Sequence, residues 1–334
     1  MSDIATQRRN RFPAKHAWDA LALGRMAARR DFTAAQKLAC ARFYITAGGI
    51  RNLYATLTRS GSHWSLLGIA IARDLAGGGD GQYDFKGDAW IPRAGAVYTK
   101  LDWREPAKAW DADADPAILS ITETIRMAAD GQASVMPRPV MFHTHLSYFR
   151  LRAARLGRMN IAVMLRSIYD SMESKYHKHR TLLGMGVRPT EYLPGAADPP
   201  GPENDYNFPW AQLVDDAIEF YNSWGDILQR HPSARLFRYD DLMAAPAETH
   251  KQLSDFWGLN LPHDCLEEAF SRITKEEMKK RLPAADPNST SRVAFRAQGA
   301  ALTDDRITFI RERMERRLQH DFGYGLDWRP REVA

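Results

Sequence analysis

The chain has 334 residues, and 44% of them are hydrophobic, which is enough for one large core or two smaller ones. The 46 basic and 41 acidic residues leave a net charge of +5, which suits anionic ligands, and no nucleic-acid-binding motif accompanies it. Only Cys40 and Cys265 are present, which argues against a disulfide framework or a metal cluster, so we expect no metal. Because no apolar run reaches the roughly 20 residues that span a bilayer and no secretory pattern opens the chain, we expect a cytoplasmic protein.

Residues 1–45 predict a helical extension packed on a single main domain at 46–330. The extension is rich in Arg, Lys and Ala with interspersed aromatic residues, which is typical of one or two amphipathic helices. A second interpretation is a peripheral membrane contact with the basic face on anionic lipid. The main domain is predicted to be continuous, because strand and helix patterns alternate without a low-complexity linker or a repeat.

The first informative pattern is a β-prone run at 53–57, a short turn, and a helix that ends near Gly77. The first N–H groups of a helix lack internal partners and carry partial positive charge, so this arrangement favours an anion. Arg59 adds a full charge, Gly61 permits close backbone approach, and hydroxyl donors come from Ser60 and Ser62. An ordinary strand–turn–helix connection is the alternative. The Walker A pattern is absent, which disfavours a nucleoside triphosphatase or kinase.

A second segment predicts another anion contact at a strand end. Residues 161–165 form an apolar run typical of a buried parallel strand, and Arg166 follows it directly. Ser167 and Asp170 have the spacing of a helix capping box, and Ser174 lies on the same helix face as Ser167. A capped helix with a solvated polar face is the alternative. Two such sites on parallel strands indicate one ligand with two separate anionic groups.

Four segments together resemble the sulfotransferases that use 3′-phosphoadenosine 5′-phosphosulfate (PAPS). Residues 57–64, Leu-Thr-Arg-Ser-Gly-Ser-His-Trp, are similar to the family's Tyr-Pro-Lys-Ser-Gly-Thr-Thr-Trp loop. Arg166 and Ser174 have the family's eight-residue spacing, and residues 142–146, Phe-His-Thr-His-Leu, resemble its Lys-Thr-His-Leu-Pro stretch. The run Tyr-Asp-Asp-Leu at 239–242, followed by a proline, resembles Tyr-Glu-Asp-Leu. The matches occur in the family's order.

The resemblance implies a three-layer α/β/α fold around a mostly parallel sheet, with a P-loop-like strand–turn–helix and the nucleotide at the carboxyl ends of the strands. It assigns the 5′-phosphosulfate to the loop residues Arg59, Ser60, Gly61, Ser62, His63 and Trp64, with Trp64 offering a flat face to adenine. It assigns the 3′-phosphate to Arg166 and Ser174. The family's late Arg-Lys-Gly segment has no clean counterpart, and Arg292 and Arg296 lie in its region.

The resemblance also implies roles in sulfuryl transfer, with PAP (3′-phosphoadenosine 5′-phosphate) as the nucleotide product. His145 would take the proton of the acceptor hydroxyl, and Arg59 would stabilise charge on the oxygen that bridges phosphate and sulfate. His143 replaces the family's lysine and is predicted to contact substrate or to shape the turn. A non-catalytic scaffold that binds PAP or a glycan is the alternative function.

The acceptor is predicted to be a glycan or glycolipid, because some glycan-modifying sulfotransferases share the Arg-Ser-Gly-Ser loop, and a small phenol or alcohol stays open. The segment 184–209 contains six prolines, which forbid a long helix. We expect it to be a loop over the acceptor, with Tyr192 and Tyr206 as acceptor contacts.

Overall fold

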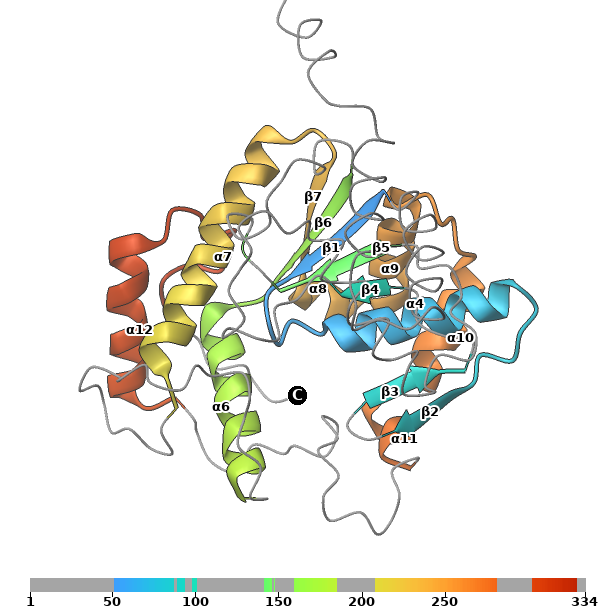
Figure 1. The fold of residues 1–334 in the computed structure, drawn as a ribbon, viewed down its shortest axis with the longest axis horizontal. Helices are drawn as coiled ribbons and strands as arrows, with labels where there is room; N and C mark the ends of the chain where they lie inside the picture. Colours follow the sequence, from blue (N-terminus) through green and yellow to red (C-terminus); the bar gives the residue numbers. More distant parts are fainter. Residues whose placement is uncertain are drawn as a thin grey trace, which may run out of the picture.

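A computed structural model describes residues 51–86, 89–93, 98–100, 141–145, 147, 159–184, 208–280 and 302–328. Its centre is a five-stranded sheet in the order β4-β5-β1-β6-β7, and every neighbouring pair of strands is parallel (Figure 1). The strands of this sheet are β1 (Asn52–Thr56), β4 (Tyr98–Lys100), β5 (Met141–Thr144), β6 (Asn160–Leu165) and β7 (Ala234–Arg238). A separate antiparallel hairpin pairs β2 (Tyr83–Lys86) with β3 (Ala89–Pro92).

Helices cover both faces of the sheet, which makes three layers. Helices α6, α7 and α12 lie on one face and α4, α9 and α10 on the other (Figure 1). Their bounds are α4 (Ser62–Ala76), α6 (Ile168–Gly184), α7 (Trp210–Arg230), α9 (Pro246–Phe256), α10 (His263–Arg272) and α12 (Asp304–Arg317), and the short helices are α8 (Tyr239–Ala244) and α11 (Lys275–Lys280). The described residues therefore confirm the predicted α/β/α fold with a parallel sheet.

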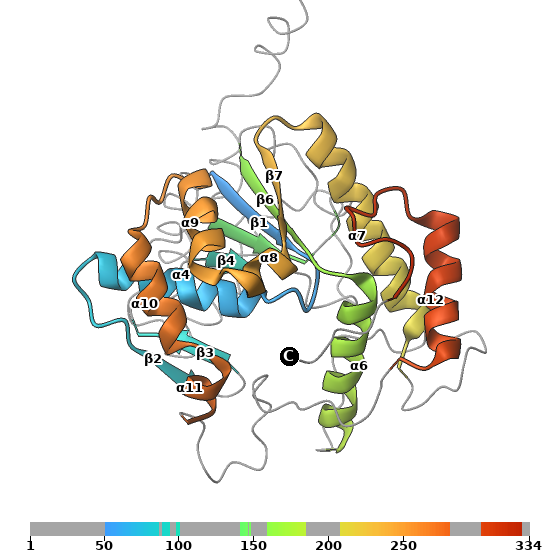
Figure 2. The ribbon, with the colours of Figure 1, turned by 180° about the vertical axis from the view of Figure 1, so that it is seen from behind.

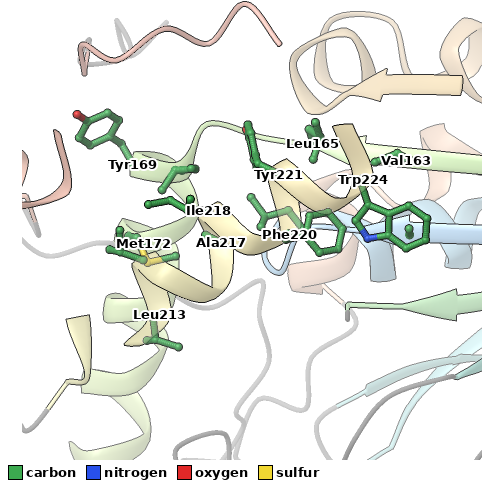
Figure 3. Close-up of a cluster of buried hydrophobic side chains, with 14 of the residues drawn as sticks. Val163, Leu165, Tyr169, Met172, Leu213, Ala217, Ile218, Phe220, Tyr221 and Trp224 are labelled. Carbon is green, nitrogen blue, oxygen red and sulfur yellow. The ribbon is translucent and has the colours of Figure 1, made fainter. Parts of the chain in front are cut away.

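Alternating side chains of the buried strands feed two separate hydrophobic cores. In β6, Val163 and Leu165 belong to the core with α6 and α7, while Met164 belongs to the core with α4 and α10. Figure 3 shows the first of these cores, where Trp224 and Phe220 of α7 lie beside the β6 side chains. A strand buried on both faces reads as a continuous apolar run, which explains why residues 161–165 show no polar alternation.

The predicted element boundaries agree with the described structure where they can be compared. Helix α4 ends at Ala76 with Gly77 as its C-cap, and the Asp170 backbone N–H lies 3.5 Å from Ser167 Oγ as the capping box requires. The extension at 1–45 and most of the proline-rich segment lie outside the described residues, so both stay predictions. In the described part of the chain, no helix is long and apolar enough to cross a membrane.

Strand register places the four motif segments at one edge of the sheet. Tyr54 pairs with His143, Thr56 with Met164, and Leu165 with Arg238, so β5, β1, β6 and β7 end at nearly the same level. Because all of these strands are parallel, the segments that follow them emerge side by side. The fold thus gathers residues that are far apart in the sequence at the carboxyl edge.

A buried chain of hydrogen bonds links β1, α4 and α9. The Tyr54 hydroxyl donates to Ser65 Oγ at 3.2 Å, and Ser65 Oγ lies 2.6 Å from His250 Nε2. His250 Nδ1 lies 2.6 Å from the Pro246 carbonyl, which can only accept, so Nδ1 carries the proton and Nε2 accepts. Burial lowers the pKa of His250 from its ordinary 6.5 to about 4, so the ring is neutral at neutral pH.

The depressed pKa of His250 predicts acid-sensitive stability. The neutral ring is favoured in the fold, so its contribution is complete above pH 6.5 and is lost as the pH falls towards the folded pKa of about 4. The loss amounts to about 3 kcal/mol for a shift of this size. Urea unfolding between pH 7 and 4 should show this decline in the wild type and a shallower one in His250→Gln. Parallel profiles for the two proteins would contradict the assignment.

Candidate functional site

The loop between β1 and α4 has an inverted backbone that suits an anion. Arg59 and Gly61 both have positive φ angles, 69° and 78°. The carbonyls of Thr58 and Arg59 accept side-chain hydrogen bonds from the next strand–helix unit: Ser171 Oγ donates to Thr58 at 2.7 Å, and Arg166 Nη1 donates to Arg59 at 2.8 Å. Helix α4 begins directly after Gly61, and its first turn contains no acidic residue, so the positive end of its dipole is not neutralised there.

The two predicted anion contacts form one continuous site. Arg59 Nε donates to Ser174 Oγ at 2.9 Å, which joins the loop to α6. Arg166 Nε is buried and has no hydrogen-bond acceptor among the described residues, and the Asp170 carboxylate lies 3.7 Å away from it. The structure therefore brings Arg59, Arg166 and Ser174 together, with a donor nitrogen of Arg166 still unsatisfied.

The Tyr239 ring, directly after β7, contacts both the loop and Arg166. The Arg166 guanidinium carbon lies 4.5 Å from the centre of that ring. A Cβ at Gly61 would lie 2.9 Å from Tyr239 Cε2 and 3.4 Å from Leu242 Cδ2. The Tyr-Asp-Asp-Leu segment thus packs on the loop where only a glycine fits, which gives this fourth motif a physical reason.

His145 is held by the last residue of β1. His145 Nδ1 lies 2.8 Å from the Thr56 carbonyl and 3.1 Å from Thr56 Oγ1. Since a carbonyl only accepts, we assign the proton of the neutral ring to Nδ1, which leaves Nε2 as the basic nitrogen. The ring is half-buried at the carboxyl edge, as a base that meets a substrate must be.

His143 is fully buried and reaches the same threonine. His143 Nε2 lies 2.9 Å from Thr56 Oγ1, and its ring centre lies 4.6 Å from that of His145. Thr56 therefore connects the two histidines. This placement gives His143 contacts inside the protein, and the predicted contact with substrate stays a prediction.

The remaining loop residues have mixed surroundings. Ser60 is buried and its hydroxyl donates to the Leu57 carbonyl at 2.5 Å, so that hydroxyl proton already has an acceptor. Trp64 Nε1 donates to the Ile273 carbonyl at 2.8 Å, and its ring lies 5.0 Å from that of Phe270. These are the contacts of a core tryptophan, and the adenine contact stays a prediction. Ser62 is buried at the first position of α4, and the His63 ring lies 6.4 Å from the His143 ring.

Sequence reasoning missed residues that hold the site together. Thr56 and Ser171 each form a hydrogen bond across the site. Their position is the only signal in the sequence that could have identified them, since Thr56 ends a strand and Ser171 lies one helical turn after Ser167. The predicted site residues Arg292, Arg296, Tyr192 and Tyr206 lie outside the described residues.

A sequence model of the family described as "Sulfotransferase domain" matches residues 53–319. The chain belongs to this family. The match spans all four segments of the carboxyl edge, from the β1 loop to the segment after β7. A search among curated proteins finds no match.

Several solved structures are similar to this sulfotransferase-family chain at low identity. A mouse sulfotransferase, SULT7A1, complexed with PAP is 18% identical over 81% of this chain and 84% of that chain, with a TM-score of 0.47. A retinol dehydratase in a complex with retinol and PAP is 14% identical over 87% and 88%, with a TM-score of 0.49. A sulfotransferase domain from the curacin biosynthetic pathway is 14% identical over 80% and 98%, with a TM-score of 0.32.

The packing of Tyr239 on Gly61 predicts an asymmetry between two glycines. Gly61 and Gly78 have nearly equal positive φ angles, 78° and 81°, but a Cβ at Gly78 would meet nothing within 4 Å. Each alanine substitution costs about 1 kcal/mol in backbone strain, and Gly61→Ala adds about 1–3 kcal/mol from the overlap with Tyr239. Urea unfolding of both variants measures the difference. Equal losses of stability would show that Tyr239 does not press on the loop.

Proposed function

We propose that this sulfotransferase takes a sulfuryl group from PAPS and transfers it to a hydroxyl acceptor. The observation that carries the proposal is the hydrogen bond from Arg59 to Ser174, because it joins the loop suited to one anionic group to the helix suited to another. A ligand with separate 5′ and 3′ anionic groups matches such a site better than one with a single phosphate. The family resemblance names PAPS as the molecule with this chemistry.

The residues present fit the donor nucleotide. The unsatisfied Arg166 Nε and the adjacent Ser174 hydroxyl would hold the 3′-phosphate, while the start of α4 and the Arg59 guanidinium would hold the 5′-phosphosulfate. The Asp170 carboxylate forms an ion pair with the Arg166 guanidinium and offsets part of its charge. This ion pair helps to hold the guanidinium in place before the nucleotide binds. His63 and Ser62 extend the loop contacts, and Arg292 or Arg296 would add charge to the 3′-phosphate.

The proposed chemistry uses His145 as the general base. Its Nε2 would take the proton of the acceptor hydroxyl while the acceptor oxygen forms a bond to sulfur and the bond from sulfur to the bridging oxygen breaks. Thr56 holds the ring through Nδ1, so the basic nitrogen keeps a fixed direction. Arg59 would stabilise the charge that develops on the bridging oxygen and stays protonated throughout.

The acceptor is proposed to be a glycan or glycolipid, with Tyr192 and Tyr206 as contacts. The Arg-Ser-Gly-Ser loop supports this preference over a small phenol or alcohol. We also propose that the protein acts in the cytoplasm, where residues 1–45 either pack on the domain or contact anionic lipid. Flotation with neutral and anionic liposomes separates these two arrangements.

Incubation with labelled PAPS and a panel of saccharides, lipids and phenols tests the function directly. Transfer of label to any hydroxyl acceptor supports the enzyme, and the acceptor class follows from which member is labelled. Tight PAP binding without transfer to any class would instead support the alternative, a scaffold that keeps the fold without the reaction.

Replacement of Arg59 should impair turnover mainly through the loss of its positive charge. Arg59→Ala removes the guanidinium from the bridging oxygen and the bond to Ser174, so we expect kcat to fall by about 100-fold or more. Arg59→Lys, which restores the residue that the family has at this position, should recover most of the loss. The matched control is Arg93→Ala, which removes an exposed arginine paired with Asp84. Normal turnover by Arg59→Ala would defeat the assignment.

Replacement of His145 should separate chemistry from nucleotide binding. We expect His145→Ala to lower kcat by about 100- to 10,000-fold and to leave PAP affinity within about twofold, because the ring is a base and not a phosphate ligand. His263→Ala, at an exposed histidine on α10, serves as the control. Calorimetry with PAP reports binding. A large loss of PAP affinity in His145→Ala would make His145 a nucleotide ligand instead.

A further inference from the structure

Residues 321–328, which follow α12, lie beyond the family match, which ends at residue 319. Three residues with positive φ angles bend this segment: Phe322 at 54°, Gly323 at 77° and Gly325 at 71°. Figure 2 shows this red segment running back past α7 and lying beside the start of α6. It therefore reaches the carboxyl end of β6, about half the chain away in sequence.

Two tyrosine hydroxyls fasten this segment to the strand end. The Tyr324 hydroxyl donates to the carbonyl of Leu165, the last residue of β6, at 3.0 Å. In return the Tyr169 hydroxyl, from the first turn of α6, donates to the Leu326 carbonyl at 2.6 Å, and Figure 3 shows this hydroxyl pointing away from the core. The segment thus bonds on both sides of Arg166, at residues 165 and 169.

Further contacts hold Tyr324 and the residues that follow β6. The Arg238 guanidinium carbon lies 4.6 Å from the centre of the Tyr324 ring, and Arg238 Nη2 donates to the Gly323 carbonyl at 3.3 Å. The Arg166 carbonyl accepts a bond from the Tyr221 hydroxyl at 2.5 Å. Burial and the nearby Asp240 raise the pKa of Tyr324, so its hydroxyl stays a proton donor. The carbonyls of Leu165, which ends β6, and of Arg166, which follows it, are therefore both occupied by tyrosine hydroxyls.

We propose that residues 321–328 are a positioning element for the 3′-phosphate site, with Tyr324 as its key residue. Tyr324 does not reach the ligand. It fixes the peptide plane that precedes Arg166, so the guanidinium is already directed at the Arg59 carbonyl and over the Tyr239 ring. This inference rests on the proposed role of Arg166, and it adds a determinant outside the family's own motifs. A preorganised arginine binds its phosphate without the cost of ordering a long side chain.

Calorimetry with PAP and adenosine 5′-phosphate tests the proposal, because only PAP carries the 3′-phosphate. Tyr324→Phe keeps the ring and removes the hydrogen bond, so we expect PAP affinity to fall about fivefold and adenosine 5′-phosphate affinity to change less than about twofold. The control is Tyr83→Phe, which removes a hydroxyl–carbonyl bond of 2.6 Å to Arg272. Tyr83 belongs to the core on the opposite face of the sheet from Tyr324, so its replacement should leave both affinities unchanged.

Each outcome separates the two proposals. If the wild type binds PAP and adenosine 5′-phosphate equally, the proposed function of Arg166 is wrong and the inference falls with it. If the wild type prefers PAP and Tyr324→Phe loses nothing, or loses affinity for both nucleotides equally, only the inference is wrong. A chain ending at His320, with its folding checked by thermal unfolding, should lose the preference for PAP more completely. An unchanged preference in that folded chain would also overturn the inference.

Discussion

The site depends on how the backbone of one loop is held. Carbonyl groups at residues 56–59 accept hydrogen bonds from His145, Ser171 and Arg166, which come from the segments after β5 and β6. One short stretch of main chain therefore sets the positions of the proposed base and of the proposed phosphate ligands relative to each other. These carbonyl oxygens are bonded to groups of the protein. The loop and the first N–H groups of α4 are therefore left with the partial positive charge that an anion requires.

This arrangement carries a conformational cost that packing must offset. Two loop residues have positive φ angles, and Arg59 is not a glycine, so its conformation is strained by about 1 kcal/mol. The Tyr239 ring and Leu242, which follow β7, pack against Gly61. The buried strands β1 and β6, which pair with each other, hold the start of the loop. The two hydrophobic cores on opposite faces of the sheet hold these strand ends at one level. The fold thus stabilises a loop that would not keep its shape alone.

Much of the fold could be predicted from the sequence, because local signals mark its helices and strands. The boundaries of α4 and β6 follow from local signals, a glycine stop and a doubly buried apolar run. The bond between Arg59 and Ser174 and the role of Thr56 could not be predicted, because single polar residues far apart in the sequence carry no pattern. The segment at 321–328 was missed for the same reason, since its contacts span about 160 residues. Trp64 is the opposite case, because the motif assigns it to the nucleotide while its observed contacts are those of a core side chain.

A crystal structure of the protein with bound PAP tests the central claim most directly. The account predicts that the 5′-phosphate lies at the start of α4 within hydrogen-bonding reach of Arg59, and that the 3′-phosphate lies against Arg166 Nε and Ser174 Oγ. It also predicts that the bond from His145 to Thr56 is kept. A nucleotide bound with either phosphate away from these groups, or with His145 turned onto a phosphate, would contradict it.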